Sequence, residues 1–213
     1  MKMYTWLRNA VLGIGTAVML AAPVAADNVK TYPTFNKGYN TVEASADTKG
    51  NKTYRLTTNN SIDFENFTIT HNGINNYFSA IDKIKGTNRI AVGPKEYPIK
   101  AVGVFKLGAK TGYLKGGIRY TLSKTGFLDV VTNGDSIEAG VVYPMTLVKG
   151  DIPLTGRIIA GAEHYMTGKK KGKTDLVSEL ELNAFLNDSL FGFGRATLSS
   201  SKPKYEIGIG VKF

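Results

Sequence analysis

The chain has 213 residues, no cysteine and a formal net charge of +10 at pH 7. The lack of cysteine excludes disulfide bonds, thiolate catalysis and cysteine-based metal sites. The length is sufficient for one domain with its own core. The positive charge favours anionic partners, which include nucleic acid, phosphorylated lipids and surface polysaccharides.

Residues 1–26 have the pattern of a secretory signal peptide. Lys2 and Arg8 supply positive charge, residues 10–22 form an uncharged apolar run, and small residues end the segment at Ala26. The apolar run is shorter than the roughly 20 residues that a transmembrane helix needs. We therefore expect export and cleavage near Ala26, which would remove two positive charges and leave a formal charge of +8.

The next part of the chain gives weaker signals. Residues 27–60 are polar, rich in Thr, Asn and Lys, and weakly periodic, so no element is assigned to them. Ser61–Thr70 is a candidate strand, and Asn72-Gly73 is a turn signal. Residues 74–84 then place apolar side chains at helical spacing, which indicates either a short amphipathic helix or an accidental period.

From about Pro98 onward, apolar residues alternate with small or polar ones in segments bounded by turn residues. The segments are longer than the 5–6 residues typical of soluble strands and close to the about 9–11 residues of a tilted transmembrane strand. The links between them alternate in length, as in membrane barrels. The tight links are 108–111, 149–153 and 187–188, and the longer ones are 123–135, 168–173 and 200–203. The predicted strands span residues 99–108, 112–122, 136–148, 154–167, 174–186, 189–199 and 204–213.

Each of these strands has one apolar face and one face with glycine and charged residues, because successive side chains point to opposite sides. Alternation alone also fits a soluble barrel with its apolar face inward. Strand length and the composition of the polar face favour the reverse arrangement, with the charges in a lumen. The segment 189–199 is ambiguous, since Phe191 and Phe193 share a face with Arg195. The charges predicted to line the lumen and form ion pairs are Lys100, Lys106, Lys115, Arg119, Glu138, Arg157, Glu163, Glu179, Glu181 and Glu206.

The last nine residues, YEIGIGVKF, resemble the C-terminal signal of Gram-negative outer-membrane β-barrels. The residues that carry this resemblance are Tyr205, Ile207, Ile209, Val211 and Phe213. The resemblance implies that the barrel-assembly machinery recognises this strand, and it suggests the class of small OmpA/OmpX-type barrels. It covers the signal peptide, the last strand and the periodicity from Pro98, but not residues 27–60, and it matches no single family.

We therefore expect an all-β, antiparallel up-and-down transmembrane β-barrel over residues 61–213, located in the outer membrane. Ser61–Thr70 completes a count of eight strands, and ten is the alternative if residues 53–58 and part of 77–84 are also strands. Eight strands leave a lumen just wide enough for side chains, so the charges would form a polar core. Outer-membrane lipid and lipopolysaccharide are the expected partners, and the oligomeric state stays open.

Four functions remain open at this point. The first is a structural or surface-interaction role with a lumen filled by ion pairs, and the second is a narrow passive pore. The third is a lipid A-modifying membrane enzyme, and the fourth is a soluble periplasmic lipid-binding barrel.

The enzyme alternative depends on histidine, of which the chain has only His71 and His164. Lipid A-modifying barrels use a histidine with serine and an acid, and His164 lies on the apolar face near Ser199 to Ser201 at the outer end of a nearby strand. Glu163 points to the other face, and no G-x-S-x-G motif is present. His164 is thus a weak catalytic candidate and an interfacial histidine is the more ordinary interpretation. No metal site or cofactor is predicted, given so few histidines and no phosphate-binding glycine loop.

The densest charge cluster is the loop with Lys169, Lys170, Lys171 and Lys173. Four lysines in five positions can attract the phosphates of lipopolysaccharide, although a merely solvated loop fits equally. Nucleic-acid binding is not expected, because no aromatic residues interleave with the lysines.

Overall fold

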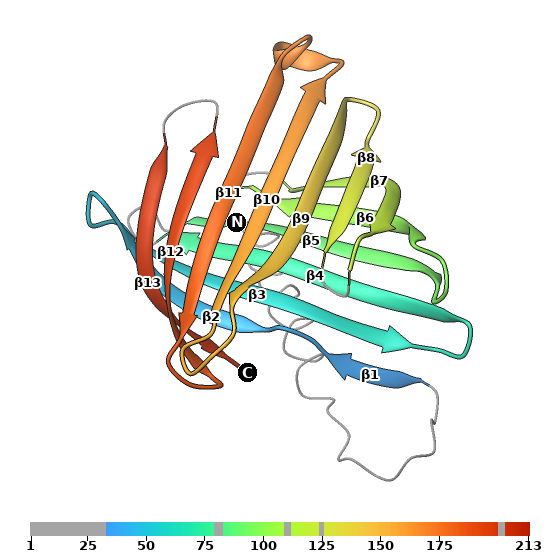
Figure 1. Cartoon of the computed structure of the whole chain (residues 1–213). Helices are drawn as coiled ribbons and strands as arrows, with labels where there is room; N and C mark the ends of the chain where they lie inside the picture. Colours follow the sequence, from blue (N-terminus) through green and yellow to red (C-terminus); the bar gives the residue numbers. More distant parts are fainter. Residues whose placement is uncertain (1–32, 79–82, 109–111, 124–125, 200–202) are drawn as a thin grey trace, which may run out of the picture.

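A computed structural model describes residues 33–78, 83–108, 112–123, 126–199 and 203–213, so the predicted signal peptide lies outside the described residues. The described residues form a single antiparallel sheet of thirteen strands and one short 3-10 helix, η2 (Gly168–Lys170) (Figure 1). No helix among them is long and apolar enough to cross a membrane. The strands are β1 (Thr34–Lys37), β2 (Thr41–Asp47), β3 (Lys52–Asp63), β4 (Phe67–Phe78), β5 (Lys83–Pro94), β6 (Ile99–Leu107), β7 (Gly112–Thr121), β8 (Phe127–Thr132), β9 (Ser136–Val148), β10 (Leu154–Tyr165), β11 (Thr174–Phe185), β12 (Leu190–Ser199) and β13 (Lys204–Lys212).

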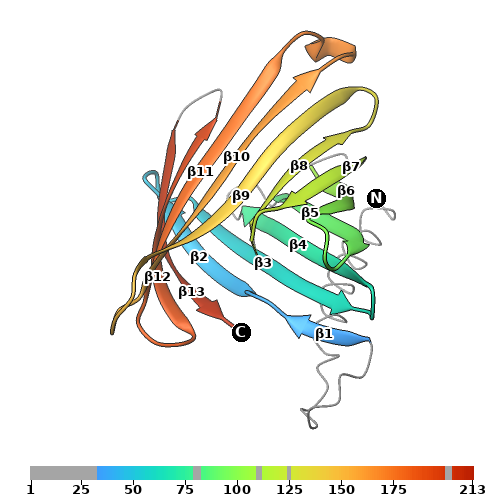
Figure 2. The ribbon, with the colours of Figure 1, turned by 45° about the vertical axis from the view of Figure 1, so that its right-hand side comes forward.

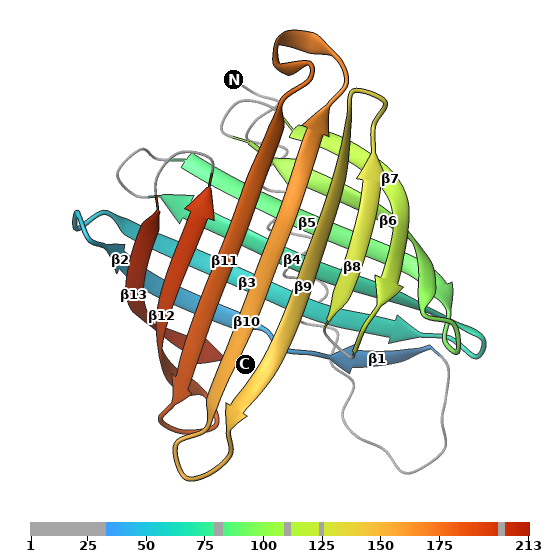
Figure 3. The same cartoon turned by 45° about the horizontal axis from the view of Figure 1, so that its top comes forward.

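Twelve of the strands, β2 to β13, form a closed up-and-down barrel. Each pairs with its sequence neighbours, and the last closes on the first, with Val211 of β13 opposite Val42 of β2. Figures 2 and 3 show the wall made by β9 to β12 crossing the opposite wall of β3 to β5, so the strands are strongly tilted.

Strand β1 lies outside this ring and pairs only with β3. Lys37 of β1 lies opposite Asn60, while Thr41 of β2 lies opposite Thr57. The two short strands therefore follow one line along β3, with one extra residue between them, as in a β-bulge.

The predicted strand count of eight, or alternatively ten, is wrong, because the N-terminal part supplies more strands than its composition suggested. The ring begins with β2 at Thr41, inside the unassigned segment 27–60. The candidate strand Ser61–Thr70 spans the turn between β3 and β4. The turn signal Asn72-Gly73 lies in the middle of β4, and the described part of 74–84 belongs to strands, not a helix.

A further strand, β8, lies in the stretch that was predicted to be a long loop, residues 123–135. Each strand changes the end of the barrel at which the chain turns. With this extra strand, the link 108–111 lies at the opposite end of the barrel from the link 149–153, whereas the prediction placed both links at the same end. The predicted alternation of tight and long links is thus wrong, and only the link between β10 and β11 is markedly long. We call the end that carries this link the hairpin end, where β10 and β11 project beyond the other strands (Figure 1), and the other end the C-terminal end.

The barrel is apolar outside and charged inside. Outward side chains such as Ile207 and Leu114 are 75% and 66% exposed, whereas the inward Lys115 and Glu181 are each 1% exposed. A few inward positions are apolar, among them the cluster Ala91, Val102, Val104 and Val131. This inversion holds around the ring, apart from a group of polar side chains in the middle of the outward faces of β3, β4 and β5.

Where β12 meets β13, phenylalanine rings of β12 fill the lumen by packing over glycines of β13. Phe191 and Phe193 point inward, which resolves the ambiguous segment 189–199, and both rings are buried. The ring of Phe191 lies over Gly210 and that of Phe193 over Gly208, so a Cβ at either glycine would overlap a ring. The small residues on the polar face of the last strand therefore make room for aromatic side chains.

The contact between Gly210 and Phe191 gives a first prediction. In Gly210→Ala, the new Cβ would lie 2.7 Å from Cε2 of Phe191, and overpacking of this kind costs about 1–3 kcal/mol. We expect a lower urea midpoint, measured by far-UV circular dichroism, and recovery when Phe191→Leu is added. Gly194→Ala is the matched control because no atom lies within 4 Å of its Cβ position, and equal midpoints for the two alanine variants would contradict the prediction.

Candidate functional site

The candidate site is the lumen, where buried charges from both walls meet in three groups. The central network contains Glu43, Arg55, Arg157, Glu179, Glu181, Arg195 and Glu206. The lysine cluster contains Lys106, Lys115, Glu138 and Glu163. The arginine cluster contains Arg89, Arg119 and Asp129.

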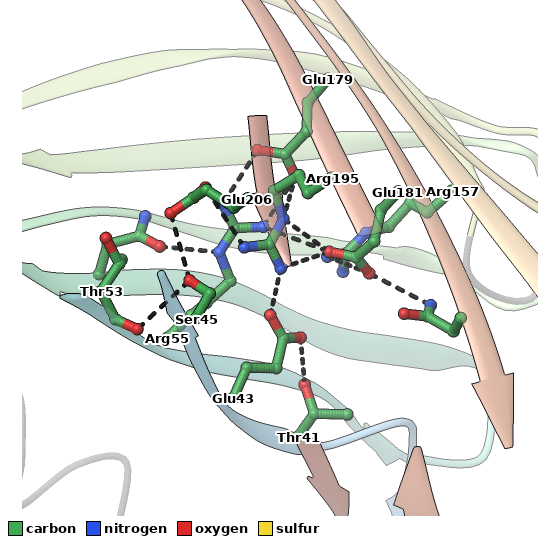
Figure 4. A network of polar contacts seen from close by, with 12 residues as sticks. Thr41, Glu43, Ser45, Thr53, Arg55, Arg157, Glu179, Glu181, Arg195 and Glu206 are labelled. Carbon is green, nitrogen blue, oxygen red and sulfur yellow. Dashed lines mark hydrogen bonds and ion pairs between the residues drawn. The ribbon is translucent and has the colours of Figure 1, made fainter. Parts of the chain in front are cut away.

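In the central network, Arg55 joins two walls of the barrel (Figure 4). Its guanidinium donates to both carboxylate oxygens of Glu179, at 2.7 and 2.9 Å. Arg55 is on β3 and Glu179 on β11, and β2, β13 and β12 lie between these strands in the ring. Asn76 of β4 accepts from Nε of Arg55 at 2.7 Å, so the guanidinium is held from two sides.

Arg195 is the most enclosed cation of this network, and carboxylates surround it (Figure 4). Its Nε donates to Glu181 at 2.9 Å, and its Nη2 contacts both Glu181 and Glu43. Arg157 also donates to both oxygens of Glu181, at 3.0 Å each. Because an unpaired buried charge is costly, the shared carboxylates let three arginines stay buried together.

The lysine cluster lies nearer the hairpin end. Nζ of Lys115 lies 2.6 Å from Glu163 and 3.2 Å from Glu138, and it donates to Ser136 at 2.9 Å. Lys106 contacts Glu138 as well. Two lysines and two glutamates thus form a compact, neutral group that links β6 and β7 to β9 and β10.

The arginine cluster is built around Asp129 of β8. Arg119 donates to both of its oxygens, at 2.7 and 2.9 Å, and Arg89 lies 3.2 Å away. The ring of Phe127 covers the Arg119 guanidinium, with its centroid 3.7 Å from Cζ. Arg119 also contacts Asn72 of β4, so this cluster too reaches across the lumen.

The ten charges predicted for the lumen all face inward, and all but Lys100 take part in ion pairs. Nζ of Lys100 donates to the carbonyl oxygen of Pro94 at 3.1 Å, and no carboxylate among the described residues pairs with it. Glu206 pairs with Lys204 at 2.9 Å and accepts from Ser45.

Several charges of the lumen were not predicted from the sequence, among them Glu43, Arg55, Arg89, Asp129 and Arg195. They fell in segments that were unassigned, assigned to a loop, or ambiguous. A usable signal was present in β2, TVEASAD, where Val42 and Ala44 alternate with Thr41, Glu43 and Ser45.

A cavity of about 710 Å³ occupies the C-terminal end of the lumen, below the central network. Its lining includes Tyr39, Phe127, Arg157 and Asn183. Among the described residues, no hydrogen-bond partner is found for Oη of Tyr39, Nε of Arg157 or Oδ1 of Asn183. These three atoms are fully buried in side chains that line the cavity, so the cavity is lined by polar as well as apolar residues.

The weak catalytic candidate, His164, lies exposed on the outward face near the hairpin end. Its Nδ1 lies 3.0 Å from Oγ1 of Thr174, whereas Glu163 faces inward to Lys115. Ser199 lies on β12 opposite Val177, with β11 between it and β10; residues 200 and 201 are outside the described residues. The described chain thus places no serine and acid around His164, and none of its His, Asp or Glu groups has the arrangement of a metal site.

The lysine-rich loop forms the tip of the β10–β11 hairpin, and all four lysines are exposed. Lys170 bonds to Asp175 at 2.6 Å and lies over the ring of Tyr165. The hydrogen bond to Asp175 raises the pKa of Lys170 above its usual value. Lys169, Lys171 and Lys173 extend the positive charge of the tip.

The side chains proposed as the assembly signal lie on the outer surface at the seam of the barrel. Tyr205, Ile207, Ile209 and Val211 are exposed along β13. Phe213 follows the strand, and its N–H donates to the carbonyl oxygen of Asn40 at 3.1 Å.

No protein-family model and no curated protein matches the chain.

The central network yields the second prediction. Arg195→Met removes the guanidinium that Glu43 and Glu181 share, and breaking a buried ion pair typically costs about 3–5 kcal/mol. We expect a large drop in the urea midpoint by circular dichroism. Lys170→Met removes a partner from an exposed ion pair and should cost at most about 1 kcal/mol; similar losses in the two variants would contradict the role of the network.

Proposed function

We propose that this protein is an integral β-barrel of the outer membrane of a Gram-negative bacterium, with a structural or surface-interaction role. The observation that carries the proposal is the inverted distribution of side chains. Large apolar residues cover the outside of the ring, and arginine, lysine and carboxylate groups fill the inside.

The physical chemistry of a bilayer accounts for this inversion. In hydrocarbon every backbone N–H and C=O must be paired internally, which a closed barrel achieves. Apart from β2 and β8, the ring strands have 9 to 13 residues, compared with the about 9–11 needed to span. An apolar surface around a whole ring would far exceed the patches found on soluble proteins, which argues against a soluble periplasmic barrel.

The proposed role follows from what the two accessible regions offer. The ion pairs cross the lumen from wall to wall, so they support a barrel whose lumen does not conduct. The lysine-rich tip of the hairpin is suited to the phosphates of lipopolysaccharide. The exposed apolar residues of β13, ending at Phe213, are suited to recognition by the barrel-assembly machinery. The predicted signal peptide agrees with export, while the lipid A-modifying alternative has no comparable support at His164.

A charge on the outer wall tests the membrane location. In Leu180→Arg, the new charge would face lipid near the middle of β11, which costs about 2–4 kcal/mol in a bilayer. We expect weaker folding into lipid vesicles, measured by loss of the heat-dependent shift in electrophoretic mobility. Ile152→Arg is the control, since Ile152 is exposed but lies in a turn. If both variants fold into vesicles like the wild type, the outer wall does not face lipid.

A second candidate function is a narrow passage for small polar solutes, which the cavity at the C-terminal end favours. The Arg55–Glu179 pair would then be its constriction. We expect no discrete current steps from the wild-type protein in planar bilayers, and steps from the double variant Arg55→Ala/Glu179→Ala, which removes this link without leaving a lone charge. Reproducible steps from the wild type would instead favour the passage over a barrel whose lumen does not conduct.

A further inference from the structure

One polar island interrupts the apolar outer wall. It lies in the middle of β3, β4 and β5, and we call it the amide plate. Along β4, Asn72 and Asn76 reach Arg119 and Arg55 in the lumen, so the alternate residues face outward. On the outward faces of the described strands, the amide plate is the only place where amide and imidazole side chains from neighbouring strands meet at mid-height. Its members are Thr58, His71, Gly73, Asn75, Gly86 and Asn88.

The side chains of the amide plate bond to one another. Asn75 and Asn88 form a reciprocal pair, with Nδ2 to Oδ1 distances of 3.3 and 3.1 Å. Nε2 of His71 lies 3.3 Å from Oδ1 of Asn88, and Nδ1 lies 3.5 Å from Oγ1 of Thr58. The island is therefore an ordered group rather than a set of scattered polar residues.

Two glycines keep this group flat against the wall. Oδ1 of Asn88 lies 2.6 Å from the position that a Cβ of Gly73 would occupy, and a Cβ at Gly86 would clash with Oδ1 of Asn75. The side-chain amide of Asn88 thus packs over Gly73, and that of Asn75 packs over Gly86. The two glycines are themselves buried beneath these amides, so it is the amide and imidazole groups that a second surface would meet.

The hydrogen bonds within the plate leave part of its capacity unused. Each amide NH₂ carries two hydrogens, and the bonds between described residues use one on Asn75 and one on Asn88. In hydrocarbon an unsatisfied polar group costs several kcal/mol, and lipid chains offer no acceptor. If the outer wall faces lipid, as the proposed function holds, this surface is stabilised by a polar partner.

We propose that the amide plate is the contact surface between two copies of this chain. The plate is uncharged when His71 is neutral, and its amides both donate and accept, so it is complementary to itself across a two-fold axis. A charged partner would find no ion pair on it. Apolar side chains lie on two of its borders: Tyr54 stacks with Tyr77 at 6.2 Å on one side, and Ile90 and Val92 are exposed on the other. These residues extend the contact around the polar centre.

Because the chain has no cysteine, single cysteines can test the contact directly. Asn75→Cys and Asn88→Cys are each reconstituted in lipid vesicles and oxidised with copper phenanthroline. We expect a disulfide-linked band of twice the chain mass from at least one of them. Leu180→Cys, outward on the opposite wall, should give none. Absence of the band from both plate variants, or an equal band from the control, would overturn the proposal.

A second measurement does not depend on cysteine. We expect wild-type protein in mild detergent to sediment as a dimer and the double variant Asn75→Leu/Asn88→Leu as a monomer, with the heat-dependent mobility shift retained in both. A monomeric wild type, a dimer that survives the double substitution, or a stoichiometric complex with lipid or another protein would overturn it.

Cell fractionation separates this proposal from the one on which it rests. Recovery from the osmotic-shock supernatant would overturn both the membrane location and the plate contact. Recovery in the outer membrane as a monomer would overturn the plate contact alone.

Discussion

The pairing of buried charges in the lumen is the constraint on which the rest of this structure depends. Once the apolar side chains face outward, the barrel has little hydrophobic material left to fill its centre, and charged side chains take that place. A buried charge without a partner is costly, so the carboxylates of the lumen need guanidinium or ammonium partners, most of which come from other strands. Glu181 meets both Arg157 and Arg195, and Glu179 meets Arg55 across the barrel. The ring can close in this form only if those partners arrive at matching heights, which makes strand register and electrostatics a single requirement.

The alternation of inward and outward residues that places the charges also matches large and small inward side chains on neighbouring strands. Where β12 brings two phenylalanines into the lumen, β13 presents Gly208 and Gly210 beneath them. Where β8 brings Phe127, its ring covers the guanidinium of Arg119. Aromatic rings thus lie against the buried guanidinium groups, and a cavity lies at the C-terminal end of the lumen. A twelve-stranded ring is wider than an eight-stranded one, and long arginine and glutamate side chains can bridge such a width where short ones could not.

The sequence predicted the kind of fold and the inward set of charges in its second half, because long, regular alternation is visible without knowledge of pairing. It failed on the strand number. Strand β2 is short, and its inward face is made of Thr41, Glu43 and Ser45, which look like a polar loop unless the partners Arg55 and Arg195 are known. In β4, the apolar residues at Ile74, Tyr77 and Phe78 mimic a helical period, although Ile74 and Phe78 face inward and Tyr77 outward. Strand β8 has six residues and was hidden by flanking turn signals. In each case long-range pairing, which composition does not encode, decides the structure.

Strand β4 connects the inside of the barrel to its outside. Successive residues along it serve different surfaces: Asn72 and Asn76 hold Arg119 and Arg55 in the lumen, while His71 and Asn75 belong to the amide plate. A rigid strand cannot shift one face without the other, so the packing at the plate and the register of the ion pairs constrain each other. The polar composition of residues 58–76, which obscured their strands in the sequence, is then explained twice. The inward asparagines orient cations that the lumen must hold, and the outward ones would form the contact between two copies if, as proposed, the outer wall faces lipid.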